Sequence, residues 1–397
     1  MSAAAKDTST DGAAGVAVRG SNKGPRSEKI PSLDGLRSAS ILLVFAAHAG
    51  ADGRLNLGGG HSVKVPGALG VTVFFFLSGY LITTLLRREF ETTQSIDFKA
   101  FYLRRLLRIF PPLYAVIALV LLLCGASVIR YEFTLTQLIA ACTQIANYWM
   151  IHWGFHSLPP GLGVLWSLAV EEHFYLVFPV LYLVLLRVGL KPLQQALAIW
   201  MLCAVFLAWR FVLVLMVHAS ADHLMFSTDT RFDSILFGCA LAVWGNPAVD
   251  PTRIPKFLWT WVLFPIGILA LTGSHLIPDQ LREASKYTVQ GIGLVPVFCA
   301  VVRYPNWGPF KILNLKPVVF LGVVSYSFYL IHSVLLDLVE RFALPGNYGA
   351  FIYGFPASLL AACLMHWLIE LPSNRLRHRM YSSRSPMTGA GLEATKI

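Results

Sequence analysis

The chain has 397 residues, of which 56% are hydrophobic and only 13% charged, and its mean hydropathy is +0.61. This composition leaves too little polar surface to cover a water-soluble globule, so a soluble fold is excluded. The net charge of +11 does not indicate nucleic-acid binding, because the basic residues lie between apolar stretches, where they set membrane orientation.

The apolar stretches predict an all-α integral membrane protein with about ten transmembrane helices and both termini in the cytoplasm. Residues 1–30 are rich in Ser, Ala, Gly and Lys, and we expect a disordered cytoplasmic tail. The membrane domain covers 31–372, and 373–397 form a basic cytoplasmic tail. The helices are expected at 37–50, 68–87, 110–128, 164–186, 194–217, 230–246, 257–274, 287–303, 317–338 and 348–370.

Residues 135–160 are apolar enough to cross but end in a turn-rich stretch, so their path decides the orientation of every later helix. If they do not cross, 24 Lys and Arg lie inside and 6 outside, whereas a crossing gives 15 against 15. The excess of basic residues on the cytoplasmic side of membrane proteins favours the first arrangement. We therefore predict a re-entrant or interfacial element here, and a separate basic amphipathic helix at 97–111 on the cytoplasmic surface.

One apolar helix carries two polar residues eleven positions apart, Arg37 and His48. Eleven residues are close to three helical turns, so both side chains share one face and are separated by about 16 Å along the axis. An ionisable group at membrane depth is costly and usually faces a protein interior or a wet cavity. His48 is therefore either a structural histidine bonded between helices or a catalytic group.

Further polar residues are expected at similar depth in other helices, and their convergence with an imidazole would suit general base catalysis. Glu171 and Glu172 are the candidate catalytic carboxylates. A structural salt bridge of Arg231 with Asp233 or Glu172 is the competing interpretation. We assign candidate substrate-binding roles to Arg210, Arg231, Asp233, Tyr326 and His332.

Six arginines are expected at the cytoplasmic entrances of the first three spans: Arg37, Arg87, Arg88, Arg104, Arg105 and Arg108. Of these, we assign Arg37, Arg104, Arg105 and Arg108 to binding of a phosphate-containing donor. Their planar guanidinium groups suit phosphate oxygens, although such charges also attract anionic lipid. A donor with phosphates at one end and a reactive group at the other, such as a coenzyme A thioester, would extend from these arginines toward His48. We expect no metal and no permanently bound cofactor.

Seven stretches in order resemble the membrane acyltransferase family 3 over residues 31 to 379: LDGLRSASILLVFAAH, GVTVFFFLSGYLIT, FYLRRLLRIFP, LWSLAVEEHFYLVFP, RFDSILFG, LGVVSYSFYLIH and IELPSNRLRHR. The resemblance places the family's Arg and His on Arg37 and His48, its paired arginines on Arg105 and Arg108, and its glutamate on Glu171 or Glu172. The sequence departs from the family pattern at Ser38, His173 and Leu371. No esterase-like domain follows, so a stand-alone form is expected.

The resemblance implies an acyl-CoA-dependent O-acyltransferase of the bacterial cytoplasmic membrane. It would move an acyl group, acetyl above all, to a hydroxyl of a cell-surface carbohydrate or related acceptor, with His48 as general base or transient acyl carrier. The alternative is a multi-span transporter or flippase for a sugar-containing or anionic substrate. Thioester cleavage by the purified protein separates the two.

Overall fold

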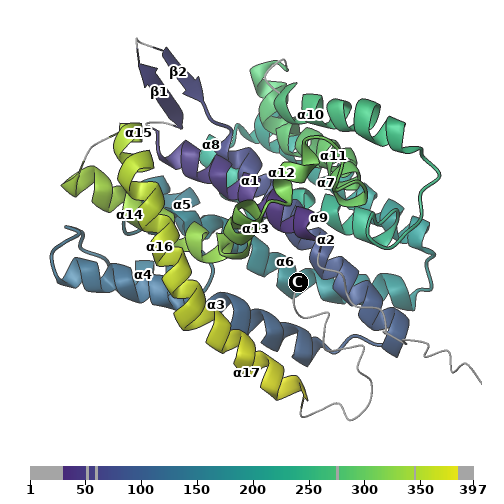
Figure 1. The fold of residues 1–397 in the computed structure, drawn as a ribbon, viewed down its shortest axis with the longest axis horizontal. Coiled ribbons are helices and arrows are strands. Elements are labelled where there is room, and N and C mark those ends of the chain that lie inside the picture. Colours follow the sequence, from purple (N-terminus) through teal and green to yellow (C-terminus); the bar gives the residue numbers. More distant parts are fainter. Residues whose placement is uncertain (1–29, 51–52, 59–60, 274–276, 344–345, 383–397) are drawn as a thin grey trace, which may run out of the picture.

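The protein is described by a computed structural model over residues 30–50, 53–58, 61–273, 277–343 and 346–382, and this part of the chain is mainly helical (Figure 1). Two short strands, β1 (Arg54–Gly58) and β2 (His61–Lys64), form an antiparallel hairpin. The helices are α1 (Pro31–His48), α2 (Gly67–Thr93), α3 (Phe98–Gly125), α4 (Leu135–Cys142), α5 (Ala146–Trp153), α6 (Leu165–Arg187), α7 (Pro192–Val212), α8 (Ala221–Phe226), α9 (Thr228–Val243), α10 (Phe264–Thr272), α11 (Asp279–Arg303), α12 (Phe310–Leu313), α13 (Lys316–Val323), α14 (Ser325–Phe342), α15 (Gly346–Gly349), α16 (Phe355–Met365) and α17 (Leu371–Ser382).

Short turns of 3-10 or π-helix extend several of these helices. They are η1 (Phe155–Ser157), η2 (Leu162–Val164), η3 (Leu213–Val217), η4 (Leu258–Leu263), η6 (Ala350–Gly354) and η7 (His366–Glu370). Local sequence fixes several helix ends. The side chain of Asp97 accepts a hydrogen bond from the Ala100 amide at the start of α3, and Gln94 ends α2 with a φ of 56°.

Within the described residues, six helical segments are long and apolar enough to cross a membrane, or seven if α13 and α14, bent by 75°, form one span. An all-α multi-pass membrane protein is confirmed, but ten spans are not. Asp34, Arg37 and His48 make α1 more polar than a typical span, and α9, with 16 residues, is about 24 Å long, less than the hydrocarbon thickness.

One helix boundary predicted from the sequence was wrong. The amphipathic segment at 97–111 and the third span form one helix, α3, which continues through Pro111 and Pro112; a neighbouring structure can compensate the lost backbone hydrogen bonds in such helices. Residues 373–382 of the predicted C-terminal tail belong to α17. The remaining tail residues, 383–397, and residues 1–29 lie outside the described residues.

Residues 135–160 do not form one crossing helix. They contain α4 and α5, with 8 residues each, and each is about 12 Å long, too short to cross about 30 Å of hydrocarbon. Whether this element is re-entrant or interfacial stays a prediction.

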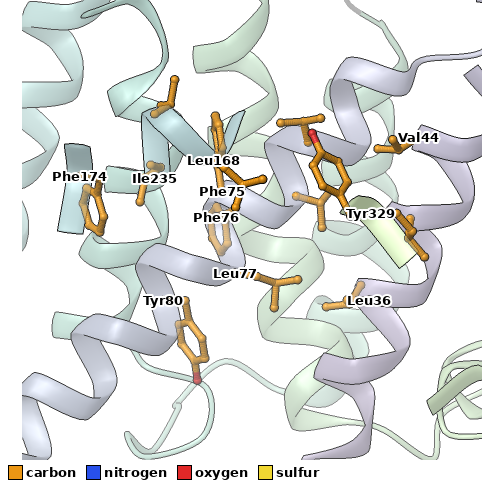
Figure 2. Packing of buried hydrophobic residues seen from close by; sticks show 14 of the residues in the cluster. Leu36, Val44, Phe75, Phe76, Leu77, Tyr80, Leu168, Phe174, Ile235 and Tyr329 are labelled. Atoms are coloured by element: carbon orange, nitrogen blue, oxygen red, sulfur yellow. The ribbon is translucent and has the colours of Figure 1, made fainter. Parts of the chain in front are cut away.

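Helix α2 lies at the centre of the bundle. The most apolar 18-residue stretch of α2 is 78% buried. The corresponding stretches within Pro192–Val217 and Gly346–Arg377 are only 22% and 17% buried, so these two segments lie at the outside of the bundle. Side chains of α2 pack there with residues of α1, α6, α9 and α14 (Figure 2). The α2 and α9 backbones approach closely at Gly79 and Gly238, since a Cβ at Gly238 would lie 2.0 Å from the Phe76 carbonyl oxygen.

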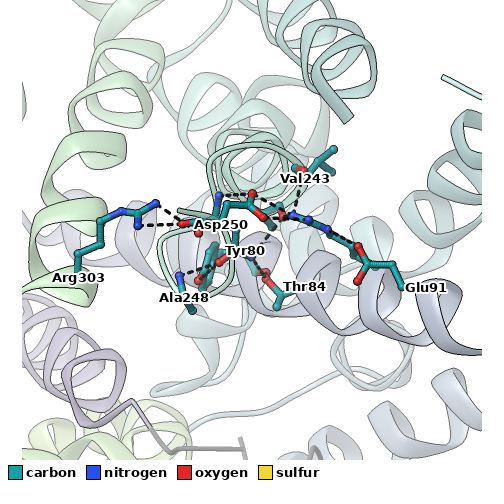
Figure 3. A network of polar contacts seen from close by, with 10 residues as sticks. Tyr80, Thr84, Glu91, Val243, Ala248, Asp250 and Arg303 are labelled. Atoms are coloured by element: carbon teal, nitrogen blue, oxygen red, sulfur yellow. Dashed lines mark hydrogen bonds and ion pairs between the residues drawn. The ribbon is translucent and has the colours of Figure 1, made fainter. Parts of the chain in front are cut away.

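A polar network joins the ends of α2, α9 and α11 (Figure 3). Arg87 donates to both carboxylate oxygens of Asp250, at 2.9 and 3.1 Å, and Arg303 donates to the Asp250 carbonyl at 2.9 Å. The Tyr80 hydroxyl donates to Asn246 at 2.7 Å. These bonds hold the loop after α9 against two neighbouring helices.

Candidate functional site

Two adjoining cavities lie among the helices. One is lined by α1, α2, α3, α6 and α14, and the other by α1, α3, α13, α14, η7 and α17. The first, which we call the core cavity, has a volume of about 120 Å³, and the second, the basic pocket, about 460 Å³. Both are lined by Arg37, Arg108, Ser325 and Tyr326, so they meet at these residues. The other polar residues of the core cavity are Ser78, Arg105, Ser167, Glu171, Tyr175 and Tyr329. Those of the basic pocket are Asp34, His366, Glu370, Asn374, Arg375 and Arg377.

Three of the four predicted arginines come together in these walls. Arg37 donates to Asp34 at 2.6 Å, and Arg105 lies over the Tyr175 ring, 5.3 Å from its centroid. Among the described residues, neither Arg105 nor Arg108 has a hydrogen-bonded or ion-paired partner. The fourth, Arg104, contacts Glu89 at 3.4 Å and lines neither cavity.

The break between α13 and α14 adds a helix N-terminus to the same place. Ser325, the first residue of α14, lines both cavities, and no side chain caps this end of the helix. Free amide groups and the helix dipole make an N-terminus favourable for anions. Together with Arg37 and Arg108, and with Arg105 in the adjoining core cavity wall, it makes the junction of the cavities a favourable environment for an anionic group.

The two glutamates have different surroundings, as expected for consecutive residues that point about 100° apart on a helix. Glu171 lines the core cavity and accepts a hydrogen bond from the Tyr175 hydroxyl, which also lies 2.6 Å from Ser78 Oγ. Glu172 lines neither cavity, and its Oε1 is buried without a hydrogen-bond partner within the described residues. Glu171 is therefore the better candidate for a role in the cavity.

His48 lies at the C-terminal end of α1, on the same helix as Arg37, as predicted. Its Nδ1 is 3.0 Å from Nε2 of His332 in α14. His48 is exposed, whereas His332 is buried. Neither histidine lines the core cavity or the basic pocket, but Tyr329 of the core cavity wall packs against His332, with 5.8 Å between ring centroids. Tyr329 therefore lies between the core cavity and the histidine pair.

The other candidate substrate-binding residues lie elsewhere in the core. Arg210 makes two hydrogen bonds to Asp233, at 2.7 and 2.9 Å, and both side chains are fully buried. Arg231 lies 3.6 Å from the centroid of the Tyr287 ring and donates to Thr72. None of the three lines either cavity, and the partner of Asp233 is Arg210 rather than Arg231. Arg210 and Asp233 form a structural ion pair that joins α7 and α9.

Sequence reasoning missed the contribution of the C-terminal helices to the basic pocket. His366 Nδ1 lies 2.6 Å from Glu370 Oε2, and both line the pocket together with Arg375 and Arg377. The spacing of four residues between His366 and Glu370 and the run of arginines in IELPSNRLRHR were the available signals. Tyr326, a predicted site residue, lines both cavities and donates to the Ile109 carbonyl at 2.7 Å.

Comparison of the chain with known proteins shows which family it resembles. The family model described as acyltransferase domain matches residues 30–369. The peptidoglycan O-acetyltransferase OatA of Listeria monocytogenes is 31% identical over 369 residues, which are 86% of this chain and 55% of the relative. The O-acetyltransferase OatA of Staphylococcus aureus (strain NCTC 8325 / PS 47) is 30% identical over 363 residues, 86% of this chain and 57% of the relative. The chain thus spans less than two thirds of these relatives. No solved structure matches.

Proposed function

This chain belongs to the membrane acyltransferase family 3, and on that premise we propose that it is an O-acyltransferase that moves an acetyl group from acyl-CoA to a hydroxyl of a cell-surface carbohydrate. The relatives named above are O-acetyltransferases, and one of them is named for peptidoglycan. For this chain the acceptor class and the acyl-CoA donor are part of the proposal.

The junction of the two cavities is the observation that carries the proposal. Arg37 and Arg108 line it from two helices, Arg105 lines the core cavity beside it, and guanidinium groups suit phosphate oxygens. The larger basic pocket would take the nucleotide, and the narrow core cavity would take the extended arm with its thioester. In the ten-span arrangement expected from the sequence, the distribution of basic residues, 24 against 6, favours a cytoplasmic opening for this pocket and cytoplasmic termini.

His48 would act as the general base at the far end of α1. It takes the proton from the acceptor hydroxyl as the oxygen attacks the thioester carbonyl carbon. The carbon–sulfur bond breaks, and the departing thiolate of coenzyme A takes the proton from His48. Because Tyr329 lies between the core cavity and the histidine pair, the acyl group has to pass this side chain to meet the acceptor.

The test measures release of free coenzyme A and acylation of an added glycan by the purified full chain in lipid nanodiscs. We expect both products from acetyl-CoA, and a loss of at least about 100-fold in His48→Ala, since general base catalysis commonly contributes this much or more. Transport of a sugar or anion without thioester cleavage would support the transporter alternative and refute the proposal. Unchanged turnover in a folded His48→Ala would remove the catalytic role of His48.

A further inference from the structure

The histidine pair has a hydrogen-bond pattern that determines where its protons lie. Nδ1 of His332 is 2.7 Å from the Tyr329 carbonyl oxygen and 3.2 Å from the Phe328 carbonyl oxygen. Carbonyl oxygens only accept hydrogen bonds, so this Nδ1 carries a hydrogen. A neutral His332 then has an unprotonated Nε2, which can only accept.

The surroundings of His332 favour the neutral ring. Its side chain is fully buried and stacks on Phe328 with 6.0 Å between ring centroids, and Phe45 lies on another side at 6.3 Å. Burying a charge without a counter-charge is costly. Tyr329 also packs against His332, and an ionised hydroxyl there would be a counter-charge. This hydroxyl instead contacts Ser167 Oγ at 2.6 Å and the Val164 carbonyl oxygen at 3.1 Å.

His48 must therefore be the donor in the 3.0 Å contact between its Nδ1 and Nε2 of His332. An imidazole with its hydrogen on Nδ1 has an unprotonated Nε2, which is the nitrogen that can accept a proton. His48 is the exposed residue of the pair, and His332 the buried one. The chain of hydrogen bonds runs from the α14 backbone through His332 to His48.

We propose that His332 is a positioning residue that holds His48 in the Nδ1–H form, so that Nε2 of His48 takes the proton from the acceptor hydroxyl. This role rests on the proposed function, and it replaces the substrate-binding role expected from the sequence. When His48 takes up the proton, its Nδ1–H bond to His332 becomes charge-assisted and stronger. The α14 backbone carbonyls fix the ring of His332, as a buried carboxylate fixes a catalytic histidine elsewhere.

The first experiment reads the tautomer directly and needs no turnover. The full chain, labelled with ¹⁵N and ¹³C in histidine, is reconstituted in nanodiscs, and the signals of His48 are assigned by their loss in His48→Gln. We expect the Nδ1–H form in the wild type and a shift toward the Nε2–H form, which free histidine prefers, in His332→Asn. An Nε2–H form in the wild type, or no change in the variant, would overturn the proposal even if the protein has no acyltransferase activity.

The second experiment uses a matched pair of variants. Gln at 332 can place its amide oxygen near the position of Nε2 and accept from His48, whereas the shorter Asn keeps a polar group near Nδ1 but does not reach His48. We expect turnover to fall about 100-fold in His332→Asn. Turnover of His332→Gln should be at least about tenfold higher than that of His332→Asn, with KM for acetyl-CoA unchanged in both variants. The exposed His156 provides a control, since His156→Asn should leave turnover unchanged.

Equal losses in the Asn and Gln variants would refute the positioning role of His332, because a purely structural histidine does not distinguish the two amides by their reach. An inactive wild type with the expected tautomer would instead contradict the proposed function.

Discussion

Replacing Arg108 by Ala tests whether the junction of the cavities binds the phosphates of the donor. Arg108 lines both cavities, and among the described residues no acidic side chain pairs with it, so its hydrogen bonds are available to a ligand. A hydrogen bond to a charged group contributes about 2 kcal/mol, which corresponds to about 30-fold in affinity. We therefore expect KM for acetyl-CoA to rise about 30-fold in Arg108→Ala, with kcat changed much less.

The assay compares two donors with the same thioester. S-Acetylpantetheine has no phosphates, so its KM should be the same in the wild type and in Arg108→Ala. The matched control is Arg104→Ala, one turn away on α3, because Arg104 contacts Glu89 and lines neither cavity; its KM for acetyl-CoA should change less than threefold. An equal loss with both donors would show that Arg108 does not act through phosphate, and a large effect at Arg104 would contradict the placement of the site.

Three further predictions follow from packing, ionisation and the cavity wall. Gly238→Ala should destabilise the protein by about 1–3 kcal/mol through overpacking against α2, whereas Gly125→Ala, with no atom within 4 Å of the added Cβ, should not; thermal unfolding in detergent measures both. Burial raises the pKa of Asp250, but the hydrogen bond and charge of Arg87 outweigh this and leave the pKa below its ordinary value. The resulting stabilisation is complete above the ordinary carboxyl pKa of about 4 and is lost as the pH falls through the lower folded pKa; Asp250→Asn should remove this part of the pH dependence of unfolding, and identical curves would refute it. Glu171→Gln should lower initial rates of acyl transfer about tenfold or more, because this carboxylate accepts from a tyrosine in the cavity wall, and an unchanged rate would remove Glu171 from the site.

Features encoded in a single helix could be predicted from the sequence. The periodicity of α-helices placed Arg37 and His48 together on one helix, and the structure confirms that α1 holds both. Apolar length identified the membrane class. The arginines Arg105 and Arg108 lie on α3 as expected and line the core cavity, because their spacing of three residues places them on one side of a helix.

Features that depend on contacts between distant segments could not. His48 and His332 are 284 residues apart, and nothing in either local pattern specifies that they meet. Asp233 pairs with Arg210, 23 residues away, because α7 packs on α9, and no local sequence pattern specifies this contact. The bend of 75° after α13 has no proline at the break, so composition gave no signal for it.

That bend connects the two ends of the proposed site. Ser325 begins α14 at the junction of the cavities, and His332 follows seven residues later, about two turns or 10 Å along the axis. Helix α1 runs alongside with Arg37 at the same junction and His48 at the histidine pair. An unbroken helix through 316–342 would place neither its amide groups beside the arginines nor a free N-terminus at the junction. The break in this span therefore aligns an anion-binding end with a histidine end on two packed helices, the arrangement that a donor with a charged head and a reactive tail requires.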